Sequence, residues 1–238
     1  MNVLAVIPTY NERDNLADLV RAVLAHPHCS VMVVDDGSPD GTGAIADALA
    51  EEFAGRVDVV HRTGRRGLGR SYVEGLQRAL AEGRADLVCQ MDADWSHDPK
   101  YLPALIEACS THDVVIGSRY LHGVSVVNWP LRRIILSSFA NRYIRAITGL
   151  DVNDCTSGFR CWRRETLAQL PLDRVVSDGY SFLTEMIFEA HRRGARVGEV
   201  PIIFVERRLG TSKLSGGVLL EAAVTPWRLR LRSFFNRP

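Results

Sequence analysis

The chain has 238 residues, of which 46% are apolar and 24% charged, and its formal net charge at pH 7 is +1. This composition is typical of a globular protein and excludes a disordered or fibrous chain. The balanced charge gives no overall attraction to nucleic acid, and no stretch reaches the roughly 20 apolar residues that span a bilayer.

The five cysteines, Cys29, Cys89, Cys109, Cys155 and Cys161, have no spacing that is typical of a metal site. Free thiols in apolar or helical stretches behave as small hydrophobic side chains. An odd number of cysteines, in a chain that opens without a basic, signal-like segment, predicts a reducing, cytoplasmic environment.

Short apolar runs alternate along the first half of the chain with stretches whose apolar residues recur at helical spacing. Strands are expected at residues 3–7, 31–34, 57–60, 87–89 and 114–116. A helix is expected after each of the first four strands. This alternation predicts an α/β fold with a mainly parallel sheet and helices on both faces.

Polar side chains gather where these strands end. The residues concerned are Tyr10, Glu12, Asp35, Asp36, Asp92, Asp94 and Arg119. Ligands of parallel sheets bind beyond the carboxyl ends of the strands. We therefore expect these side chains to converge on one site.

Two carboxylates separated by one residue, Asp92 and Asp94, follow the buried strand at residues 87–89. Placed at a strand end, both can face one cation, and oxygen ligands favour Mg²⁺ or Mn²⁺ carrying substrate phosphates. The same pattern also suits an acidic loop that caps the helix after Pro99, and we expect Asp98 to be that cap.

Adjacent carboxylates at Asp35 and Asp36 are costly to crowd without a cation or donors nearby. A base or ribose would supply such donors, although both residues also suit the cap of the next helix. The glycine-rich residues 64–69 follow the third strand without the acid that a dinucleotide fingerprint requires, so we favour a loop before a helix. Its two arginines, Arg65 and Arg66, are suited to closing over an anion.

The second half of the chain contains two segments that mix apolar residues with arginine, at residues 129–147 and 218–235. Each fits either a core helix with a solvated face or a helix at a membrane surface, with arginines at lipid phosphates.

Between these segments, residues 155–160 fit a loop or short strand and residues 180–192 a helix. Glu185 on that helix fits a helix-dipole role as well as a catalytic one. Residues 197–205 predict an edge strand, because Pro201 interrupts them. Arg207 and Lys213 flank a Gly/Ser loop that suits either a pyrophosphate or solvent.

The motifs along the chain together resemble the family 2 glycosyltransferases of GT-A fold. The resemblance is carried by residues 6–12 (VIPTYNE), 33–42 (VVDDGSPDGT) and 91–94 (MDAD). Residues 117–120 (GSRY), 156–160 (TSGFR), 199–202 (EVPI) and 207–213 narrow it to the dolichol- or polyprenol-phosphate mannosyltransferases. The resemblance covers nearly the whole chain, in order.

The resemblance implies a Rossmann-like GT-A fold with C-terminal amphipathic helices. It implies one domain over residues 1–238. Residues 1–120 would bind nucleotide sugar and metal, residues 121–213 the acceptor, and residues 214–238 would form the amphipathic tail.

The resemblance also implies roles for individual residues. The nucleotide sugar would contact Pro8, Tyr10, Glu12, Val34, Asp35, Asp36, Asp92, Ala93, Asp94, Arg207 and Lys213. Asp92 and Asp94 would bind Mg²⁺ or Mn²⁺, with Ser96 as a further candidate ligand. Arg119, Arg133 and Ser137 would receive the acceptor phosphate, and catalysis would involve Asp94, Arg119 and Glu185.

Two positions depart from the family pattern. Ser96 stands where some relatives have a glutamine that serves as an additional metal ligand, which leaves that place to water. Asp178 stands where some have a lysine before the Gly-Tyr pair, which removes a phosphate contact.

The activity implied is direct, inverting transfer of mannose from GDP-mannose to dolichol or polyprenol monophosphate. The enzyme would be peripheral on the cytoplasmic face of a membrane, with or without a membrane-anchored partner subunit. Two alternatives stay open: UDP-glucose or another nucleotide sugar as donor, and a non-catalytic lipid-binding subunit of the same fold.

Overall fold

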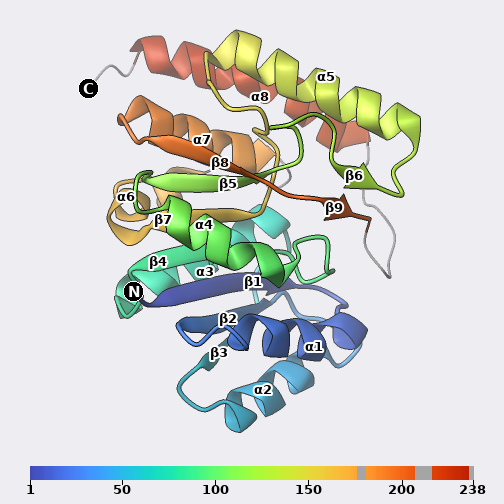
Figure 1. Cartoon of the computed structure of the whole chain (residues 1–238), viewed down its shortest axis with the longest axis vertical. Helices are drawn as coiled ribbons and strands as arrows, with labels where there is room; N and C mark the ends of the chain where they lie inside the picture. Colours follow the sequence, from blue (N-terminus) through green and yellow to red (C-terminus); the bar gives the residue numbers. More distant parts are fainter. Residues whose placement is uncertain (176–180, 207–215, 236–238) are drawn as a thin grey trace.

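The computed structural model describes residues 1–175, 181–206 and 216–235, with no side-chain detail for 216–219, 234 and 235. A sheet of seven strands runs through its centre (Figure 1). Its strands are β1 (Val3–Thr9), β2 (Cys29–Asp35), β3 (Val57–His61), β4 (Leu87–Gln90), β5 (Val114–Ser118), β7 (Arg160–Arg163) and β8 (Val197–Pro201). A separate parallel pair consists of β6 (Val126–Val127) and β9 (Phe204–Val205).

Helices pack on both faces of the sheet, as the sequence predicts (Figure 1). The α-helices are α1 (Arg13–Leu24), α2 (Thr42–Glu52), α3 (Leu68–Glu82), α4 (Leu102–Ala108), α5 (Leu131–Thr148), α6 (Arg164–Ala168), α7 (Ser181–Arg192) and α8 (Gly216–Phe235). Two short 3₁₀ helices are η1 (Pro99–Tyr101) and η2 (Leu172–Arg174).

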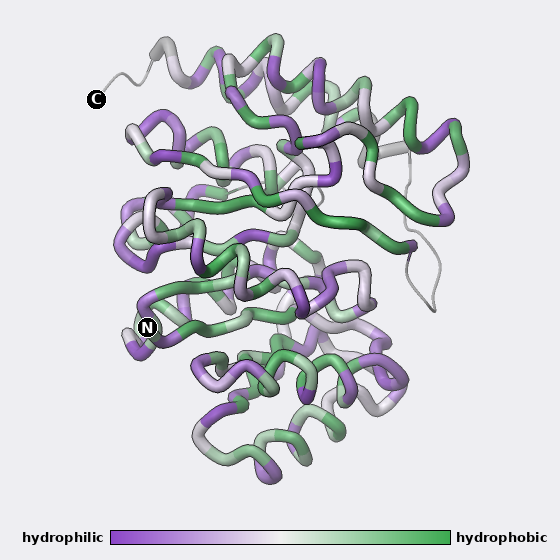
Figure 2. The backbone as a smooth tube through the Cα atoms, in the orientation of Figure 1, coloured by the Kyte–Doolittle hydropathy of each residue, from purple (hydrophilic) through white to green (hydrophobic). Residues whose placement is uncertain are grey.

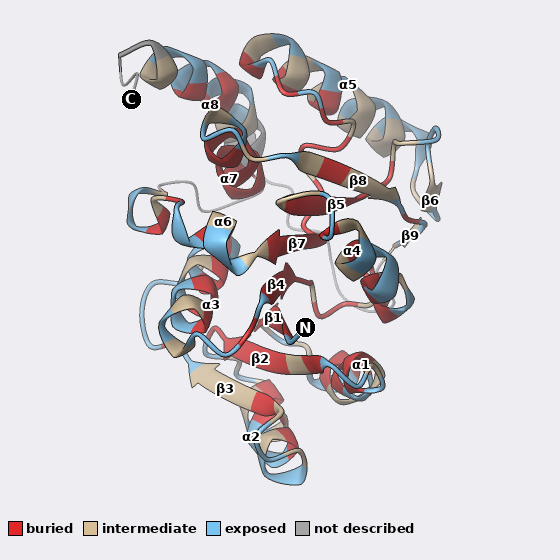
Figure 3. Cartoon of the chain, turned by 60° about the vertical axis from the view of Figure 1, so that its left-hand side comes forward, coloured by how far each residue is buried: buried red, intermediate tan, exposed pale blue. Residues whose placement is uncertain are grey.

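The alternation of side chains along β1 divides the core into two layers. Val3, Ala5 and Ile7 pack with α1, α2 and α4, whereas Leu4 and Val6 pack with the layer that includes α3 and α7. Successive side chains of a strand point to opposite faces, so a run of apolar residues fills both layers. The inner strands of the sheet are accordingly hydrophobic and buried, whereas the outer strands β3 and β8 are mostly only partly buried (Figures 2 and 3).

The strand order is β3-β2-β1-β4-β7-β5-β8, and all of these strands are parallel except β7. The mainly parallel sheet is therefore confirmed, and so is the edge position predicted from Pro201, because β8 is an outer strand. The sequence pattern did not identify β7 as a central strand, since residues 155–160 fitted a loop equally well.

The buried guanidinium of Arg160 explains why β7 was hard to identify. Its side chain is fully buried and donates to the carbonyl oxygens of Ser157, Leu183 and Cys155, at 2.9, 2.6 and 2.9 Å. Burial lowers the pKa of Arg160 to about 10, so the guanidinium stays charged at neutral pH. Three carbonyl acceptors make that buried charge tolerable, and an arginine can then begin a central strand.

Helices α5 and α8 lie side by side beyond the β8 edge (Figure 1). Apolar side chains stay exposed on both of them: Leu131, Ile135, Leu136, Phe139, Leu220, Val224, Trp227 and Leu231. We call these eight side chains the apolar surface. Among the described residues, no helix has the length and apolar character needed to span a membrane.

Candidate functional site

The carboxyl ends of β2 and β4 carry the acidic pairs predicted from the sequence. Asp35 is the last residue of β2, and Asp36 follows it. Asp92 and Asp94 lie two and four residues after the end of β4. Parallel strands bring these ends to one edge of the sheet, as expected.

The carboxylates of Asp35 and Asp36 are both buried, and the protein itself supplies their donors. Asp35 accepts from the hydroxyls of Thr9 at 3.1 Å and Ser38 at 2.5 Å. Asp36 pairs with the Arg62 guanidinium and accepts from the backbone N–H of Gly67 at 2.9 Å. A bound base or ribose is therefore not needed to relieve their crowding, which corrects that part of the sequence argument.

The other residues predicted to contact the nucleotide lie around the same strand ends. The Tyr10 hydroxyl accepts from Arg66 at 2.8 Å, and the Arg66 guanidinium lies 4.7 Å from the centre of the Tyr10 ring. Glu12 accepts from the Asn15 amide at 2.8 Å. Pro8 and Val34 are buried in adjacent strands, and Val34 faces α3, so contact with a ligand there would be through backbone.

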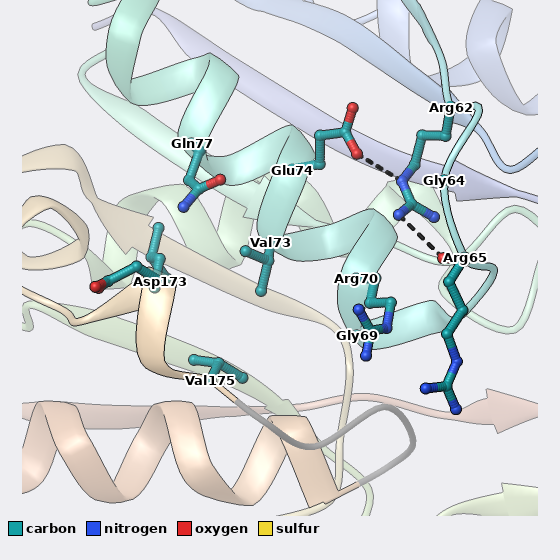
Figure 4. Close-up of a pocket in the computed structure, with 11 residues that line it drawn as sticks. Arg62, Gly64, Arg65, Gly69, Arg70, Val73, Glu74, Gln77, Asp173 and Val175 are labelled. Carbon is teal, nitrogen blue, oxygen red and sulfur yellow. Dashed lines mark hydrogen bonds and ion pairs between the residues drawn. The ribbon is translucent and has the colours of Figure 1, made fainter.

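A pocket of about 630 Å³ opens beside α3 and η2 (Figure 4). Arginines line it, and Arg62 is fixed there by an ion pair with Glu74 at 2.7 Å and by the Arg65 carbonyl at 3.3 Å. The predicted loop at residues 64–69 is confirmed up to Gly67, because α3 begins at Leu68.

Asp92 is held between a tyrosine and a histidine. The Tyr72 hydroxyl donates to Asp92 Oδ1 at 2.7 Å, and the Asp92 N–H donates to His97 Nδ1 at 2.9 Å. Burial, and then the charge of Asp92, raise the pKa of Tyr72 well above its usual value, so its phenol keeps the proton that it donates. His97 is buried and stacked on Phe159 at 5.0 Å.

Asp94 is oriented by the turn that follows it. It accepts from the Ser96 hydroxyl at 2.5 Å and from the Ser96 N–H at 3.1 Å. Trp95 between them has a φ of 64°, a left-handed conformation that is uncommon for a bulky residue and that recurs at functional sites. Asp98 caps η1 through the N–H of Lys100 at 3.0 Å, as predicted.

The two acids open into a cavity of about 170 Å³, which we call the acid–arginine cavity. Asp92, Asp94, Ser96, Arg119, Arg133 and Ser137 all line it. Arg119 and Arg133 therefore lie at the same cavity as Asp92 and Asp94, the two acids predicted to bind a metal. Among the described residues, no group of three or more His, Cys, Asp or Glu side chains could hold a metal. A divalent ion here would take oxygen ligands from Asp92, Asp94 and a substrate.

Arg119 is fixed at this cavity by a buried carboxylate. Its Nε and Nη2 each donate to Asp154 at 2.7 Å, and its backbone N–H does so at 3.0 Å. Burial opposes ionisation of Asp154, but the Arg119 charge and hydrogen bonds outweigh it, and the pKa of Asp154 is lowered. This two-point grip sets the direction of the guanidinium.

Arg133 lies over the ring of Trp129, 3.9 Å from its centre, and pairs with the carboxylate of Glu206. Trp129 also packs against Phe204, with ring centres 5.3 Å apart. Ser137 lies one helical turn after Arg133 on α5, so both residues line the same cavity.

Glu185 lies elsewhere. It is buried on α7 and faces Arg228 at 3.8 Å and Arg232 at 3.6 Å, both on α8. It is not among the residues that line the acid–arginine cavity. This environment favours a role in attaching α8 to α7 over the catalytic role predicted from its place in the sequence.

Three residues named from the sequence, Asp178, Arg207 and Lys213, lie outside the described residues. The phosphate contacts of Arg207 and Lys213, and the loss of such a contact at Asp178, stay predictions.

The sequence analysis missed Tyr72, His97, Asp154 and Glu206. Neither Tyr72 nor His97 belongs to one of the sequence motifs. For His97, the available signal was its position in the sequence, five residues after Asp92 and in the same turn. Nothing in the sequence pairs Asp154 with Arg119 or Glu206 with Arg133, because each pair is far apart in the chain.

An apolar groove of about 160 Å³ between α5, α7 and α8 adjoins the acid–arginine cavity. The two hollows share Leu136, Ala140, Thr156 and Ala222 as lining residues. Phe139 lines the groove and is also part of the exposed apolar surface. A charged cavity thus lies beside an apolar groove, and that groove borders the apolar surface.

Comparison with known proteins identifies the family. The family model described as glycosyl transferase family 2 matches residues 4–170. The chain is 48% identical over 233 residues to polyprenol monophosphomannose synthase of Mycolicibacterium smegmatis, covering 96% of this chain and 88% of that protein. It is also 48% identical over 235 residues to undecaprenyl-phosphate mannosyltransferase of Micrococcus luteus, covering 98% and 96%.

Among solved structures, glucosyl-3-phosphoglycerate synthase from Mycobacterium tuberculosis, in complex with Mn²⁺, UDP and glucosyl-3-phosphoglycerate, superposes with a TM-score of 0.66. The sequences are 19% identical, and the match covers 100% of this chain and 81% of that one. This likeness establishes the fold, which is the GT-A fold that the motifs predicted. The family model and the two relatives at 48% identity show that this chain is an enzyme of glycosyltransferase family 2.

Proposed function

We propose that this chain transfers mannose from GDP-mannose to a polyprenol monophosphate, with inversion at the anomeric carbon. The names of two relatives support a mannosyl donor and a polyprenyl phosphate acceptor, because they specify mannose and a polyprenol or undecaprenyl phosphate. One structural observation carries the proposal: a cavity whose lining includes three acids and two arginines adjoins an apolar groove. That arrangement suits an acceptor with a phosphate head and an apolar chain.

In this reaction an oxygen of the lipid phosphate attacks C1 of mannose. A new C1–O bond forms to that phosphate, the bond from C1 to the β-phosphate of GDP breaks, and GDP leaves with the electron pair. The nucleophile is already an anion, so the reaction makes little demand on a general base. Rate enhancement comes mainly from positioning and from charge compensation.

Arg119 and Arg133 are assigned to the acceptor phosphate, together with Ser137. Arg119 presents a guanidinium whose direction is fixed by Asp154, which suits it to positioning an anion. Arg133 and Ser137 lie one turn apart on α5, beside the apolar groove. The head of the lipid would meet these residues while its chain follows the groove.

Asp92 and Asp94 would hold the divalent ion that accompanies the nucleotide sugar. Hard carboxylate oxygens fit Mg²⁺ or Mn²⁺, and Tyr72 and Ser96 orient these carboxylates by donating to them. When bound, such an ion compensates the charge of the leaving diphosphate. Pro8, Tyr10, Glu12, Val34, Asp35 and Asp36 are assigned to the nucleotide, Ala93 to its sugar, and Arg207 and Lys213 to its phosphates.

The apolar surface of α5 and α8 supports a peripheral position on a membrane, where a long polyprenol phosphate is available, and we assign the protein to the cytoplasmic face. Burial of exposed apolar side chains gives the main attraction, and cations beside them add to it at anionic headgroups. A membrane-anchored partner subunit would strengthen this association.

The test is a transfer assay with radiolabelled GDP-mannose, UDP-glucose and further nucleotide sugars, a polyprenyl phosphate in detergent, and added Mg²⁺ or Mn²⁺. Asp92→Asn and Asp94→Asn should each lower transfer at least 100-fold without loss of the folded state, because a ligand charge is removed. Transfer of glucose in preference to mannose would refute the donor. Near-normal turnover in both variants would refute the metal site.

A further inference from the structure

The acid–arginine cavity contains two arginines, and each has a carboxylate partner of a different kind. The partner of Arg119, Asp154, has no exposed surface. The partner of Arg133, Glu206, has a side chain that is 25% exposed, and Arg133 itself is 21% exposed. Glu206 lines the cavity, whereas Asp154 is not one of its lining residues.

Asp154 cannot leave Arg119 without disrupting buried structure. Its backbone N–H donates to Glu199 at 3.0 Å, and its carboxylate also accepts from the Thr156 hydroxyl at 3.2 Å. A buried carboxylate with this many partners is costly to unpair. The charge of Arg119 is therefore matched in every state of the site.

Glu206 is held by its backbone, and its side chain faces the cavity. It directly follows β9, and its N–H donates to the carbonyl oxygen of Val127 at 3.2 Å. The carboxylate reaches Arg133 while that guanidinium rests on Trp129. Because Glu206 and Arg133 are each partly exposed and both line the cavity, an entering anion can reach Arg133 and take the place of this carboxylate, which the fully buried Asp154 does not allow at Arg119.

We propose that Glu206 is a resident counter-ion of the acceptor subsite: it competes with the lipid phosphate for Arg133 and favours the exchange of product for fresh substrate. This inference rests on the proposed function. It adds a residue for which neither the sequence motifs nor the comparisons give a role. Glu206 acts through Arg133 and is a positioning residue, because it does not contact the reacting atoms.

The charges of substrate and product give the exchange its direction. A phosphate monoester carries about −1.5 to −2 charges at pH 7. After transfer it is a phosphodiester with a single negative charge. A carboxylate of charge −1 is outcompeted for Arg133 by the incoming monoester, but it competes with the diester on nearly even terms. Like-charge repulsion then helps the product to leave.

The first experiment measures binding. Geranyl phosphate, a soluble isoprenyl phosphate, is titrated calorimetrically into wild type, Glu206→Gln and Glu206→Asp. We expect Glu206→Gln to bind it about threefold to tenfold more tightly, because a competing anion is lost from a partly exposed ion pair. Glu206→Asp should restore competition. Glu107→Gln on α4, an exposed side chain, is the matched control for the lost charge and should bind as wild type does.

The second experiment separates turnover from binding. Glu206→Gln should lower the KM for geranyl phosphate and also lower kcat, because the mannosyl diester leaves more slowly. Inhibition by added mannosyl diester should strengthen by a larger factor than the KM falls. A merely structural role for Glu206 would weaken binding of substrate and product together.

Arg133→Ala makes the two proposals distinguishable. If Arg133→Ala weakens geranyl phosphate binding but Glu206→Gln leaves both binding and product inhibition unchanged, the counter-ion inference is refuted and the proposed function stands. If wild type transfers no mannose to geranyl phosphate or to a long polyprenyl phosphate, the proposed function is refuted and the inference with it. In the Arg133→Ala background, Glu206→Gln should no longer tighten binding.

Discussion

At the scale of single residues, the site depends on side chains that orient the charged groups. Tyr72 and Ser96 hold the two acids after β4, and Asp154 holds Arg119. Most of the residues that would contact substrate were accessible to sequence analysis, because they belong to short motifs, whereas Arg133 and Ser137 were assigned from the family resemblance alone. Their supports were not, because an isolated tyrosine in a helix or an aspartate in a loop carries no such signal.

Tyr72→Phe tests one of these supports. The substitution keeps the buried ring and removes only the hydroxyl that donates to Asp92. We expect the concentration of Mn²⁺ for half-maximal transfer to rise about tenfold, as is typical when a group that orients a metal ligand is lost.

Tyr143→Phe is the matched control, because it removes a tyrosine hydroxyl that bonds to Ala223 on α8 instead. It should leave the dependence on Mn²⁺ unchanged. An equal response of the two variants, or none in Tyr72→Phe, would contradict the role assigned to Tyr72.

At the scale of elements, the alternating apolar pattern predicted the parallel strands and most of the helices. It failed at β7, where a strand of four residues begins with Arg160 and pairs antiparallel with both neighbours. Neither the burial of Arg160 nor the antiparallel direction of β7 produces a pattern in the neighbouring sequence that would predict a central strand. The three carbonyl oxygens that compensate the arginine come from residues 155, 157 and 183, and only the folded chain brings them together.

The packing of α3 on the sheet gives a prediction at this scale. A Cβ atom at Gly75 would lie 2.6 Å from Cγ1 of Val6 and 2.8 Å from Cγ2 of Val34. Gly75→Ala should therefore lower the free energy of unfolding by about 1–3 kcal/mol, although alanine is the better helix former. Urea denaturation measures the difference.

Val6→Ala serves as the partner in a double-mutant cycle, because it removes the methyl group nearest to the new Cβ. The cost of Gly75→Ala should be smaller in that background. Strict additivity of the two substitutions would show that α3 is free to shift away from β1.

At the scale of the whole molecule, the acid–arginine cavity at the polar strand ends adjoins the apolar groove, which borders the apolar surface of α5 and α8. The sequence left open whether these helices belong to the core or to a membrane surface. Both descriptions hold in part: Leu229 of α8 and Ile144 of α5 are buried, while other apolar side chains of the same helices are exposed. The spacing of apolar residues alone could not separate the buried side chains from the exposed ones, because arginines are interspersed among both groups.

Liposome flotation tests the membrane assignment. Ile135→Glu/Phe139→Glu on α5 and Leu220→Glu/Leu231→Glu on α8 place acids on side chains that are 55–69% exposed, so the fold should tolerate them. We expect each pair to reduce flotation with anionic vesicles at least fivefold, because apolar contact is lost and repulsion from headgroups is gained. Mannose transfer to vesicle-borne lipid should fall in parallel.

Ala44→Glu/Ala48→Glu adds the same charge to exposed positions of α2, at the opposite end of the molecule from α5 and α8 (Figure 1). This control should float as wild type does. Equal flotation of all variants would show that the apolar surface does not bind the membrane and contacts another partner instead.

The antiparallel strand β7 also sets the order in which the site can assemble during synthesis. Strand β4, which presents Asp92, gains its second neighbour only when residues 160–163 have left the ribosome, because it pairs on that side with β7 alone. Arg160 in turn needs the carbonyl oxygen of Leu183. In a nascent chain that ends before β7, the half of the protein assigned to the nucleotide lacks a completed sheet. The exposed edge of β4 is then open to pairing with other chains.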